Sequence, residues 1–472
     1  MSSDSTLDAV ALGKRPRSLV HMFLQQVEDA PDADAFYYPV EGGWQESTWA
    51  HTHELVEGLA AGLVALGVQP EDRVAMIVST RYEWVLGYLA VLWSGAAVIA
   101  LDPAADDETI ARVLTDCQAR VVIAEDYETV RTLWRVRADI RSVSKVVQVD
   151  GDFPDDRVLT LEGLLALGHA HLAESPRALS QRLYAVRRQG LAALVYVRDR
   201  DGVLRSVELS HAALTYRATA VRMLGRLGRD DLVYLPLPLT SPYAQAVLGV
   251  QLATGFPLAV EGRPERAVDS MRTMHPTVVA AGVDLLEKVR ARADRDTGDG
   301  RLRRRTTERA FDVARQVHEA RADDQRVRGR LARQHRSLDR KVLAEVRGLF
   351  GERLRFVVVA GGGVDADLAD YFDLVGVTVL EAYGRAETGP VSVGLPEDAG
   401  SRSAGRALPG TEVEIGDDGG MRVRGPGVAA RYHAVRGAPP DLLDAGWLHT
   451  GDAGVLDAEG RLRVLGRLVR RS

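Results

Sequence analysis

The first part of the chain alternates helical and strand-like patterns of apolar residues. Apolar positions from Leu55 to Leu66 recur at helical spacing and end at Gly67, and a continuous apolar run follows at 74–78. Strands that are covered by helices on both faces have such uninterrupted runs. The alternation continues with a helical pattern around 110–114 and an apolar run at 121–124. It predicts βαβ units that build a parallel sheet.

The longest uncharged stretch runs from Trp84 to Leu101 and has eighteen residues. This length is at the lower limit for crossing a bilayer. Ser94 and Gly95 interrupt the stretch, which has helical spacing before them and a strand-like run after them. We therefore expect a buried helix followed by a buried strand rather than a membrane span.

After a polar stretch at about 150–185 the alternation starts again, with strands expected at 191–197, 232–237, 277–281 and 356–359 and a helix from Ser210. Short segments divided by Gly, Pro and Asp turns follow from 401 to 465, which is typical of antiparallel strands. The fold class is therefore α/β, with two doubly wound sheets and a small β-rich, barrel-like unit. The predicted divisions are 1–18 (a polar lead-in), 19–185, 186–400, 401–465 and a short hinge at 466–472.

The amino-acid composition restricts the classes of function that the chain can have. The 472 residues include 60 basic and 66 acidic side chains, a net charge of -6, which disfavours wrapping nucleic acid. The single cysteine, Cys117, excludes an internal disulfide and a four-thiolate zinc site and fits a reducing compartment. The first 18 residues have no long apolar core, so they are not a secretory signal. We expect a cytoplasmic protein.

One segment, 288–348, departs from this charge balance. Between Lys288 and Arg347 there are 19 Lys/Arg and 10 Asp/Glu, a local net of +9. Phe311, Ala314, Val317 and His318 form one semi-apolar stripe at helical spacing, which predicts a charged helix pair. Three interpretations remain open: a solvated helical insertion, a patch for anionic membrane lipids, and a nucleic-acid surface. The last is disfavoured because aromatic residues for base stacking are absent.

Three short motifs offer candidate chemistry. Gly361, Gly362 and Gly363 follow an apolar strand and precede a helix, so they suit either an anion or a tight turn. The segment 381–388 joins a tyrosine to a glutamate at a strand end, which suits base stacking and magnesium or an ordinary surface loop. The segment 447–452 ends in a carboxylate that could accept sugar hydroxyls or stabilise its own turn.

The order and spacing of these motifs resemble the adenylate-forming superfamily, and within it the long-chain acyl-CoA synthetases. The resemblance extends from Leu19 to Arg467 and rests on the following segments: 67–74, 275–277, 286–289, 354–356, Tyr383-Gly384 with Glu387-Thr388, 405–413, 423–428 and 446–452. Members of this family join a carboxylate to AMP with ATP and magnesium, and then transfer the acyl group to coenzyme A. The resemblance therefore implies a homologue of ATP-dependent long-chain fatty acid:CoA ligases that binds a fatty acid or another carboxylate.

Residue by residue, the resemblance implies three groups of ligand contacts. Gly361, Gly362 and Tyr383 would line the adenine and acyl crevice. Glu387 would be the catalytic magnesium ligand, and Gly384 and Thr388 belong to the same motif. Asp452 and Arg467 would hold the ribose.

The sequence departs from the family pattern where phosphates are handled. A charged hairpin at 196–206 replaces the Ser/Thr/Gly-rich phosphate loop, and alternation along its strand could point Arg198 and Arg200 at the nucleotide and Asp199 and Asp201 away. Ala386 replaces a threonine, Leu239 a histidine, and Gly466 the hinge aspartate. The chain ends at Ser472, where the family continues with a domain that carries the adenylation lysine.

These departures leave two hypotheses. One is a divergent ligase that is completed by a C-terminal domain or a partner protein in trans. The other is a non-catalytic homologue that binds an acyl ligand, AMP or a partner.

Overall fold

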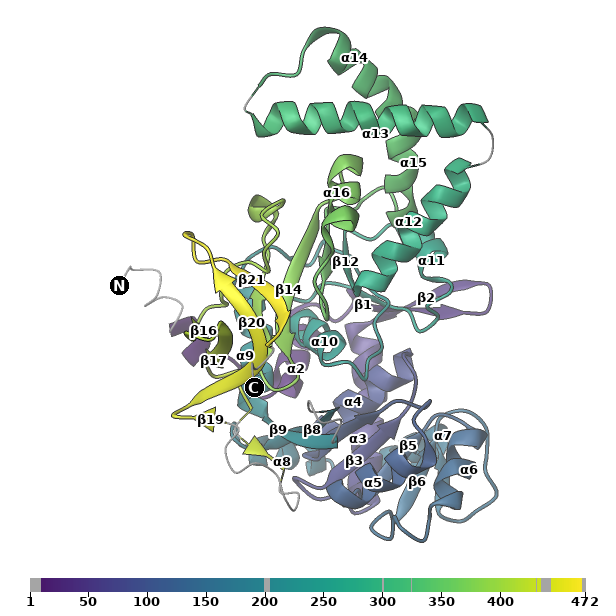
Figure 1. Cartoon of the computed structure of the whole chain (residues 1–472). Coiled ribbons are helices and arrows are strands. Elements are labelled where there is room, and N and C mark those ends of the chain that lie inside the picture. Colours follow the sequence, from purple (N-terminus) through teal and green to yellow (C-terminus); the bar gives the residue numbers. More distant parts are fainter. Residues whose placement is uncertain are drawn as a thin grey trace.

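Two mixed sheets and one smaller antiparallel sheet organise the chain (Figure 1). The computed structural model describes residues 10–198, 204–298, 301–323, 325–429, 431–433 and 443–468. The first sheet has eight described strands, in the order β18 (Arg431–Tyr432), β9 (Leu204–Ser210), β8 (Leu191–Arg198), β4 (Ala97–Leu101), β3 (Arg73–Ile77), β5 (Val121–Ala124), β6 (Lys145–Gln148) and β7 (Val158–Thr160). The strands from β8 to β7 are parallel, and β9 and β18 extend them as an antiparallel edge.

The second sheet also has eight described strands, in the order β15 (Gly389–Val393), β14 (Val379–Arg385), β13 (Phe356–Val359), β12 (Val278–Ala281), β10 (Val233–Leu235), β11 (Leu258–Val260), β1 (Asp34–Val40) and β2 (Gly43–Thr48). Only the edge strands β2 and β15 are antiparallel to their neighbours. Each sheet contains strands from both sides of residue 185, where a division is predicted. Strands β1 and β2, which precede residue 185, lie in the second sheet, and β8 and β9, which follow it, lie in the first.

Helices cover the two larger sheets. Their bounds are α2 (Leu19–Asp29), α3 (Trp49–Ala65), α4 (Tyr82–Ser94), α5 (Asp107–Cys117), α6 (Tyr127–Arg135), α7 (Leu161–Glu174), α8 (Ala178–Ala185), α9 (His211–Arg222), α10 (Pro242–Thr254), α11 (Ala267–Met274), α12 (Val283–Gly298), α13 (Arg301–Ala322), α14 (Gly329–Leu338), α15 (Ala344–Arg347) and α16 (Ala366–Val375). Polar caps set several helix starts, since Ser210 accepts from the N–H of Ala213 and Asp365 from that of Leu368.

The α/β fold expected from the sequence is confirmed. The predicted helix ending at Gly67 is α3, and the runs at 74–78, 121–124 and 356–359 correspond to β3, β5 and β13. The uncharged stretch from Trp84 to Leu101 is the buried helix α4 followed by the buried strand β4. In the described part of the chain, no helix combines the length and apolarity that a bilayer crossing requires.

The third sheet contains β16 (Glu412–Ile415), β17 (Gly420–Arg424), β20 (Trp447–Leu456), β19 (Leu443–Asp444) and β21 (Leu462–Arg467), all paired antiparallel. It packs a small core of its own around Met421, Val423 and Leu462, to which Tyr383 and Val391 of the second sheet contribute. The β-rich unit expected after residue 401 is therefore present, and it lies against the end of the second sheet that carries the site.

The basic segment forms a helical projection. Helices α13 and α14 extend away from the second sheet at the top of Figure 1. On the inner side of α13, Ala314 and Val317 are buried and Phe311 stacks on Tyr371 of α16, with ring centroids 5.1 Å apart. The predicted apolar stripe is thus confirmed for these positions, whereas His318 is exposed.

His211, the first residue of α9, gives the fold a pH dependence. Its side chain is buried and its Nδ1 has no hydrogen-bond partner. Burial lowers the pKa of His211 to about 4, and the neighbouring His21 lowers it further while Glu71 opposes the shift. The unfolded chain therefore binds a proton that the folded chain excludes between pH 6.5 and pH 4. Stability is retained above this window and is lost as the pH falls through it.

We expect His211→Phe to remove this dependence. Between pH 7 and pH 4, the free energy of unfolding of the wild type should fall by about 3 kcal/mol more than that of the variant. Urea unfolding at a series of pH values measures the difference, in which carboxylate titration common to both proteins cancels. Parallel pH profiles for the two proteins would refute the assignment.

Candidate functional site

The loop between β14 and β15 carries Glu387, and its shape depends on small and hydroxyl side chains. A side chain at Gly384 would meet the carbonyl of Gly389 at 2.2 Å, so the two strands approach closely only because Gly384 has none. The Thr388 hydroxyl accepts from the N–H of Arg385 at 3.0 Å and donates to the carbonyl of Gly389 at 2.8 Å. Gly384 and Thr388 therefore hold the loop that presents Glu387.

A buried arginine on α9 supports the same loop from behind. The Arg217 guanidinium donates to the carbonyls of Ala386 (3.1 Å), Glu387 (3.3 Å) and Gly427 (2.9 Å and 3.1 Å). Burial lowers the pKa of Arg217 to about 10, partly offset by Tyr88 and Glu387, so the group stays charged at neutral pH. Gly389 lies against this guanidinium, where a Cβ would come within 2.2 Å of its Nε.

Asp452, on β20, is the acceptor at the centre of the site. Its Oδ2 accepts from the Tyr383 hydroxyl at 2.8 Å, and its Oδ1 lies 3.2 Å from Nη1 of Arg467 on β21. Burial raises the pKa of Tyr383 above its usual value, and Asp452 raises it further, so the phenol keeps its proton and donates. Because a carboxylate oxygen can accept more than one hydrogen bond, Asp452 retains acceptor capacity beyond these partners.

Arg385, the last residue of β14, lies between Glu387 and Asp452. Its Nε is 3.3 Å from Oε2 of Glu387, its Nη2 3.4 Å from Oε1 of Glu387, and its Nη1 3.3 Å from Oδ2 of Asp452. Burial alone would lower the pKa of Arg385, but the two carboxylates outweigh this effect and raise it. One guanidinium therefore bridges both acidic side chains that the sequence singles out.

These groups border a polar cleft of about 850 Å³ between the first and third sheets. Arg198, Arg385, Glu387 and Arg467 line it, together with the segment 448–451. The structure thus brings Arg198 to the same cleft as Glu387. The predicted companion of Arg198, Arg200, lies outside the described residues. The described lining contains four arginines, Arg198, Arg385, Arg422 and Arg467, and three carboxylates, Glu387, Asp417 and Asp418. Guanidinium groups suit an anionic ligand, and carboxylates suit hydroxyl groups on the same ligand.

A second, apolar cavity of about 120 Å³ lies under the second sheet, between α9 and α10 and the strands β10, β12, β13 and β14. Val221, Val247, Val250 and Phe256 are among its lining residues. Tyr383 also lines it, so the ring of Tyr383 borders the apolar cavity while its hydroxyl bonds Asp452 beside the polar cleft.

The glycine turn after β13 lies near this boundary. A Cβ on Gly361, whose φ is +89°, would be 3.6 Å from the Tyr243 ring, and one on Gly362 would be 3.8 Å from Val283. The Tyr243 hydroxyl in turn donates to the carbonyl of Gly384 at 2.6 Å. Both glycines are exposed, and they connect to the Glu387 loop through Tyr243.

Comparison with known proteins identifies the family. The family model described as "AMP-binding enzyme" matches residues 23–433. The chain belongs to the AMP-binding enzyme family. It is homologous to long-chain fatty-acid–CoA ligases: it is 29% identical over 459 residues to the long-chain-fatty-acid–CoA ligase FadD15 of Mycobacterium bovis, covering 94% of this chain and 73% of that protein.

Two solved structures share the fold of this AMP-binding enzyme family member. A long-chain-fatty-acid-CoA ligase (FadD1) from Archaeoglobus fulgidus aligns with a TM-score of 0.74 at 15% identity, covering 96% of this chain and 85% of that one. The N-terminal domain of FACL13 from Mycobacterium tuberculosis aligns with a TM-score of 0.70 at 18% identity, covering 96% of this chain and 100% of that one.

The residues present do not fit the magnesium ion that the AMP-binding enzyme family uses. Both carboxylate oxygens of Glu387 face the Arg385 guanidinium. Among the described residues, no group of three or more His, Cys, Asp or Glu side chains could hold a metal ion. A divalent cation beside Glu387 would have to displace a cation that the chain itself supplies.

Two arginines and one tyrosine of the site were not singled out by sequence analysis. Arg385 was visible in the motif between Gly384 and Ala386, yet only the fold shows that it reaches Asp452. Arg217 had a detectable signal, a charged residue inside an otherwise uncharged helical run from 211 to 221. The position of Tyr243 depends on the approach of α10 to β14, which no local pattern encodes.

We expect Arg217→Met to destabilise the fold by about 2–4 kcal/mol, because the buried carbonyls of Ala386 and Gly427 lose their side-chain donor. The carbonyl of Glu387 still accepts from the N–H of Ala429. Urea unfolding measures the loss. Arg222→Met, at an exposed position of the same helix, is the matched control and should stay within about 0.5 kcal/mol of the wild type. Equal stability of the two variants would contradict the supporting role of Arg217.

Proposed function

We propose that the chain binds a long-chain carboxylate in the apolar cavity and an adenosine monophosphate moiety in the polar cleft, as an acyl-adenylate site that does not turn over ATP by its own residues. One observation carries the proposal: Tyr383 lines the apolar cavity, and its hydroxyl donates to Asp452, which pairs with Arg385 and Arg467 of the polar cleft. An acyl-adenylate combines an apolar chain with an anionic nucleotide, so it needs these two environments side by side.

On the polar side, Asp452 and Arg467 are the residues for the ribose and phosphate. Asp452 has a buried carboxylate with spare acceptor capacity, which suits two sugar hydroxyls. Arg198, Arg385 and Arg467 supply positive charge for one phosphate. Gly361 and Gly362 are exposed and have no side chain, so a flat base could approach their backbone near the Tyr243 ring.

On the apolar side, the lining residues favour an alkyl chain. The cavity is bordered by aliphatic and aromatic side chains of α9, α10 and the sheet, and each methylene transferred from water to such a place gains about 0.8 kcal/mol. The curated relative named as a long-chain-fatty-acid–CoA ligase supports the same substrate class.

The residues expected near a triphosphate favour a site that does not turn over ATP. Glu387 is engaged by Arg385, and the position that is a threonine in the family is Ala386, whose side chain has no hydroxyl. On the strands themselves, Tyr196 of β8 and Ser206 of β9 donate to Asp116, at 2.6 Å and 3.2 Å. The competing proposal is a complete ligase that uses ATP, magnesium and coenzyme A. It is supported by the presence of Glu387 and Arg467 on one cleft, with Asp452 paired to Arg467.

Calorimetry with AMP and with palmitate tests the binding. We expect the wild type to bind both, and Ala246→Phe, which fills the apolar cavity, to weaken palmitate binding by about tenfold or more while AMP binding stays unchanged. Ala170→Phe, an exposed alanine on α7, is the control and should bind both like the wild type. ATP–pyrophosphate exchange should stay at background.

Two results would contradict this proposal. Absence of both AMP and palmitate binding by the folded wild type would refute the acyl-adenylate site. Exchange above background would refute the lack of turnover and favour the complete ligase.

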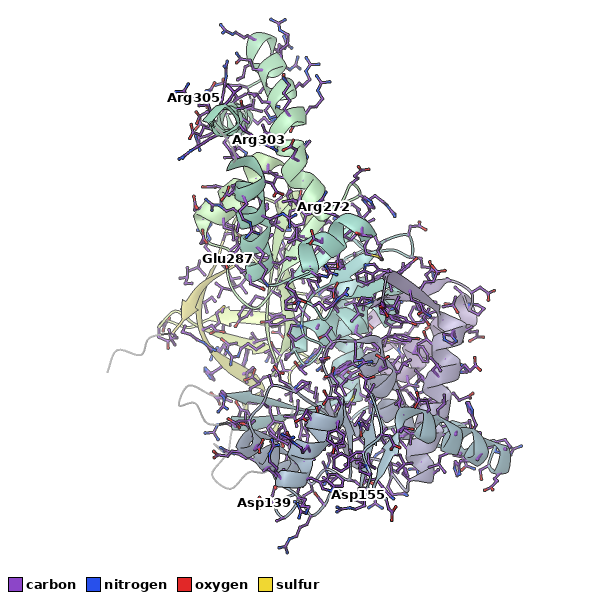
Figure 2. The ribbon with its side chains drawn as sticks, turned by 90° about the vertical axis from the view of Figure 1, so that its right-hand side faces the viewer. Asp139, Asp155, Arg272, Glu287, Arg303 and Arg305 are labelled. Atoms are coloured by element: carbon purple, nitrogen blue, oxygen red, sulfur yellow. The ribbon has the colours of Figure 1, made fainter. Side chains whose placement is uncertain are left out.

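We also propose that the α13–α14 projection faces an anionic lipid surface. Figure 2 looks along α13 and shows Arg303 and Arg305 on it, at the opposite end of the molecule from Asp139 and Asp155. Arg303 pairs with Glu345, whereas Arg305, Arg309 and Arg321 are exposed and have no ion-pair partner among the described residues. Unpaired arginines on a projecting helix are available to lipid phosphates.

We expect the triple change Arg305→Gln, Arg309→Gln and Arg321→Gln to weaken binding to phosphatidylglycerol-containing vesicles by about 100-fold, since each basic residue near such a surface contributes about 1 kcal/mol. Vesicle co-sedimentation measures the change.

The control for this prediction changes the same number of exposed arginines on the body of the protein: Arg112→Gln, Arg222→Gln and Arg353→Gln. An equal loss in both triple variants would show that net charge, not the projection, drives the binding. Binding of the wild type to uncharged phosphatidylcholine vesicles alone would also contradict the proposal.

A further inference from the structure

Glu387 lines the polar cleft and Asp452 lies beside it, and arginines of the chain itself compensate the charges of both carboxylates. The side chains of Glu387 and Asp452 are only 7% and 10% exposed, and that of Arg385 between them is 19% exposed. The two carboxylate oxygens of Glu387 lie next to Nε and Nη2 of Arg385, and Nη1 of Arg385 lies 3.3 Å from Oδ2 of Asp452. This is the forked arrangement in which a guanidinium binds a carboxylate with two contacts.

Hydrogen bonds of the surrounding backbone fix the position of Arg385. Its N–H donates to the Thr388 hydroxyl, and the carbonyls of the next two residues accept from Arg217. The backbone that carries the Arg385 side chain is therefore held by hydrogen bonds at Arg385 itself and at the two residues that follow. With Arg467 on Asp452, the cluster contains two cations and two anions and is electrically balanced without any ion from solution.

We propose that Arg385 takes the place of the divalent cation in this site, so that the cleft binds an adenosine monophosphate without magnesium. The inference rests on the proposed nucleotide binding. Both Glu387 oxygens lie 3.3–3.4 Å from the Arg385 guanidinium, so a divalent cation that approached Glu387 would meet the positive charge of Arg385 at close range. The guanidinium also borders the cleft, where it can donate to a phosphate oxygen.

This proposal differs from a purely structural salt bridge in its consequence for metal binding. If Arg385 only braced the loop, its removal would destabilise the fold and create no new affinity. If it replaces a cation, its removal leaves Glu387 and Asp452 as two neighbouring buried carboxylates, which a divalent ion can then bind.

Manganese is the probe of the metal site, measured by electron paramagnetic resonance on the full chain without nucleotide. We expect the wild type to leave Mn²⁺ free and Arg385→Met to bind it. Arg385→Lys keeps a cation and should leave Mn²⁺ free, and the double variant Arg385→Met with Glu387→Gln should lose the acquired binding. Thermal unfolding confirms that each variant is folded.

Calorimetry with AMP in EDTA and in excess MgCl₂ gives the second readout. The wild type should bind AMP equally in both buffers. Arg385→Met should bind about tenfold more weakly in EDTA and recover in MgCl₂.

Three results would overturn the inference: Mn²⁺ bound by the wild type, Mn²⁺ left free by folded Arg385→Met, or AMP affinity of the wild type that rises with magnesium. If Arg385→Met does not fold, the wild type and Arg385→Lys still test the inference. Mn²⁺ binding by either protein would contradict the inference, and a lack of Mn²⁺ binding by both would support it. Lack of AMP binding in every buffer, with the expected Mn²⁺ results, would refute the proposed nucleotide function and leave the cation replacement standing.

Discussion

The contact of Arg385 with Glu387 and Asp452 joins the two sheets that form the site. Glu387 lies after β14 of the second sheet, and Asp452 lies on β20 of the third. The Arg385 nitrogens lie 3.3–3.4 Å from oxygens of the two carboxylates. The three groups can be buried together only if their charges compensate, because burying an unpaired carboxylate costs free energy. The relative placement of the second and third sheets at this end of the molecule, and the shape of the polar cleft that Arg385 and Glu387 line, depend on this compensation.

The same cluster links the apolar and polar halves of the site. Tyr383 donates to Asp452 and lines the apolar cavity, and Tyr243 connects the glycine turn to Gly384. Behind them, Arg217 fixes the loop carbonyls. A ligand that spans both halves would therefore contact a network that is already organised, so little ordering of side chains would accompany its binding.

Much of the fold could be predicted from the sequence, since the strands β3, β5, β8, β12 and β13 are uninterrupted apolar runs and the helices between them have clear apolar spacing. The exchange of β1 and β2 into the second sheet could not, because pairing between strands about 200 residues apart leaves no local pattern. For the site, motif order indicated Glu387, Tyr383 and Asp452. It could not reveal that Arg385 reaches both carboxylates, because that contact depends on how the third sheet packs on the second.

The central claim is that this member of the AMP-binding enzyme family holds a nucleotide beside an internal cation. A crystal structure of the full chain grown with AMP and MnCl₂, with anomalous diffraction recorded at the manganese edge, tests it most directly. The account predicts AMP in the cleft with its ribose on Asp452, Arg385 still between Glu387 and Asp452, and no anomalous peak beside Glu387. A manganese peak on Glu387 with the Arg385 side chain displaced would contradict it.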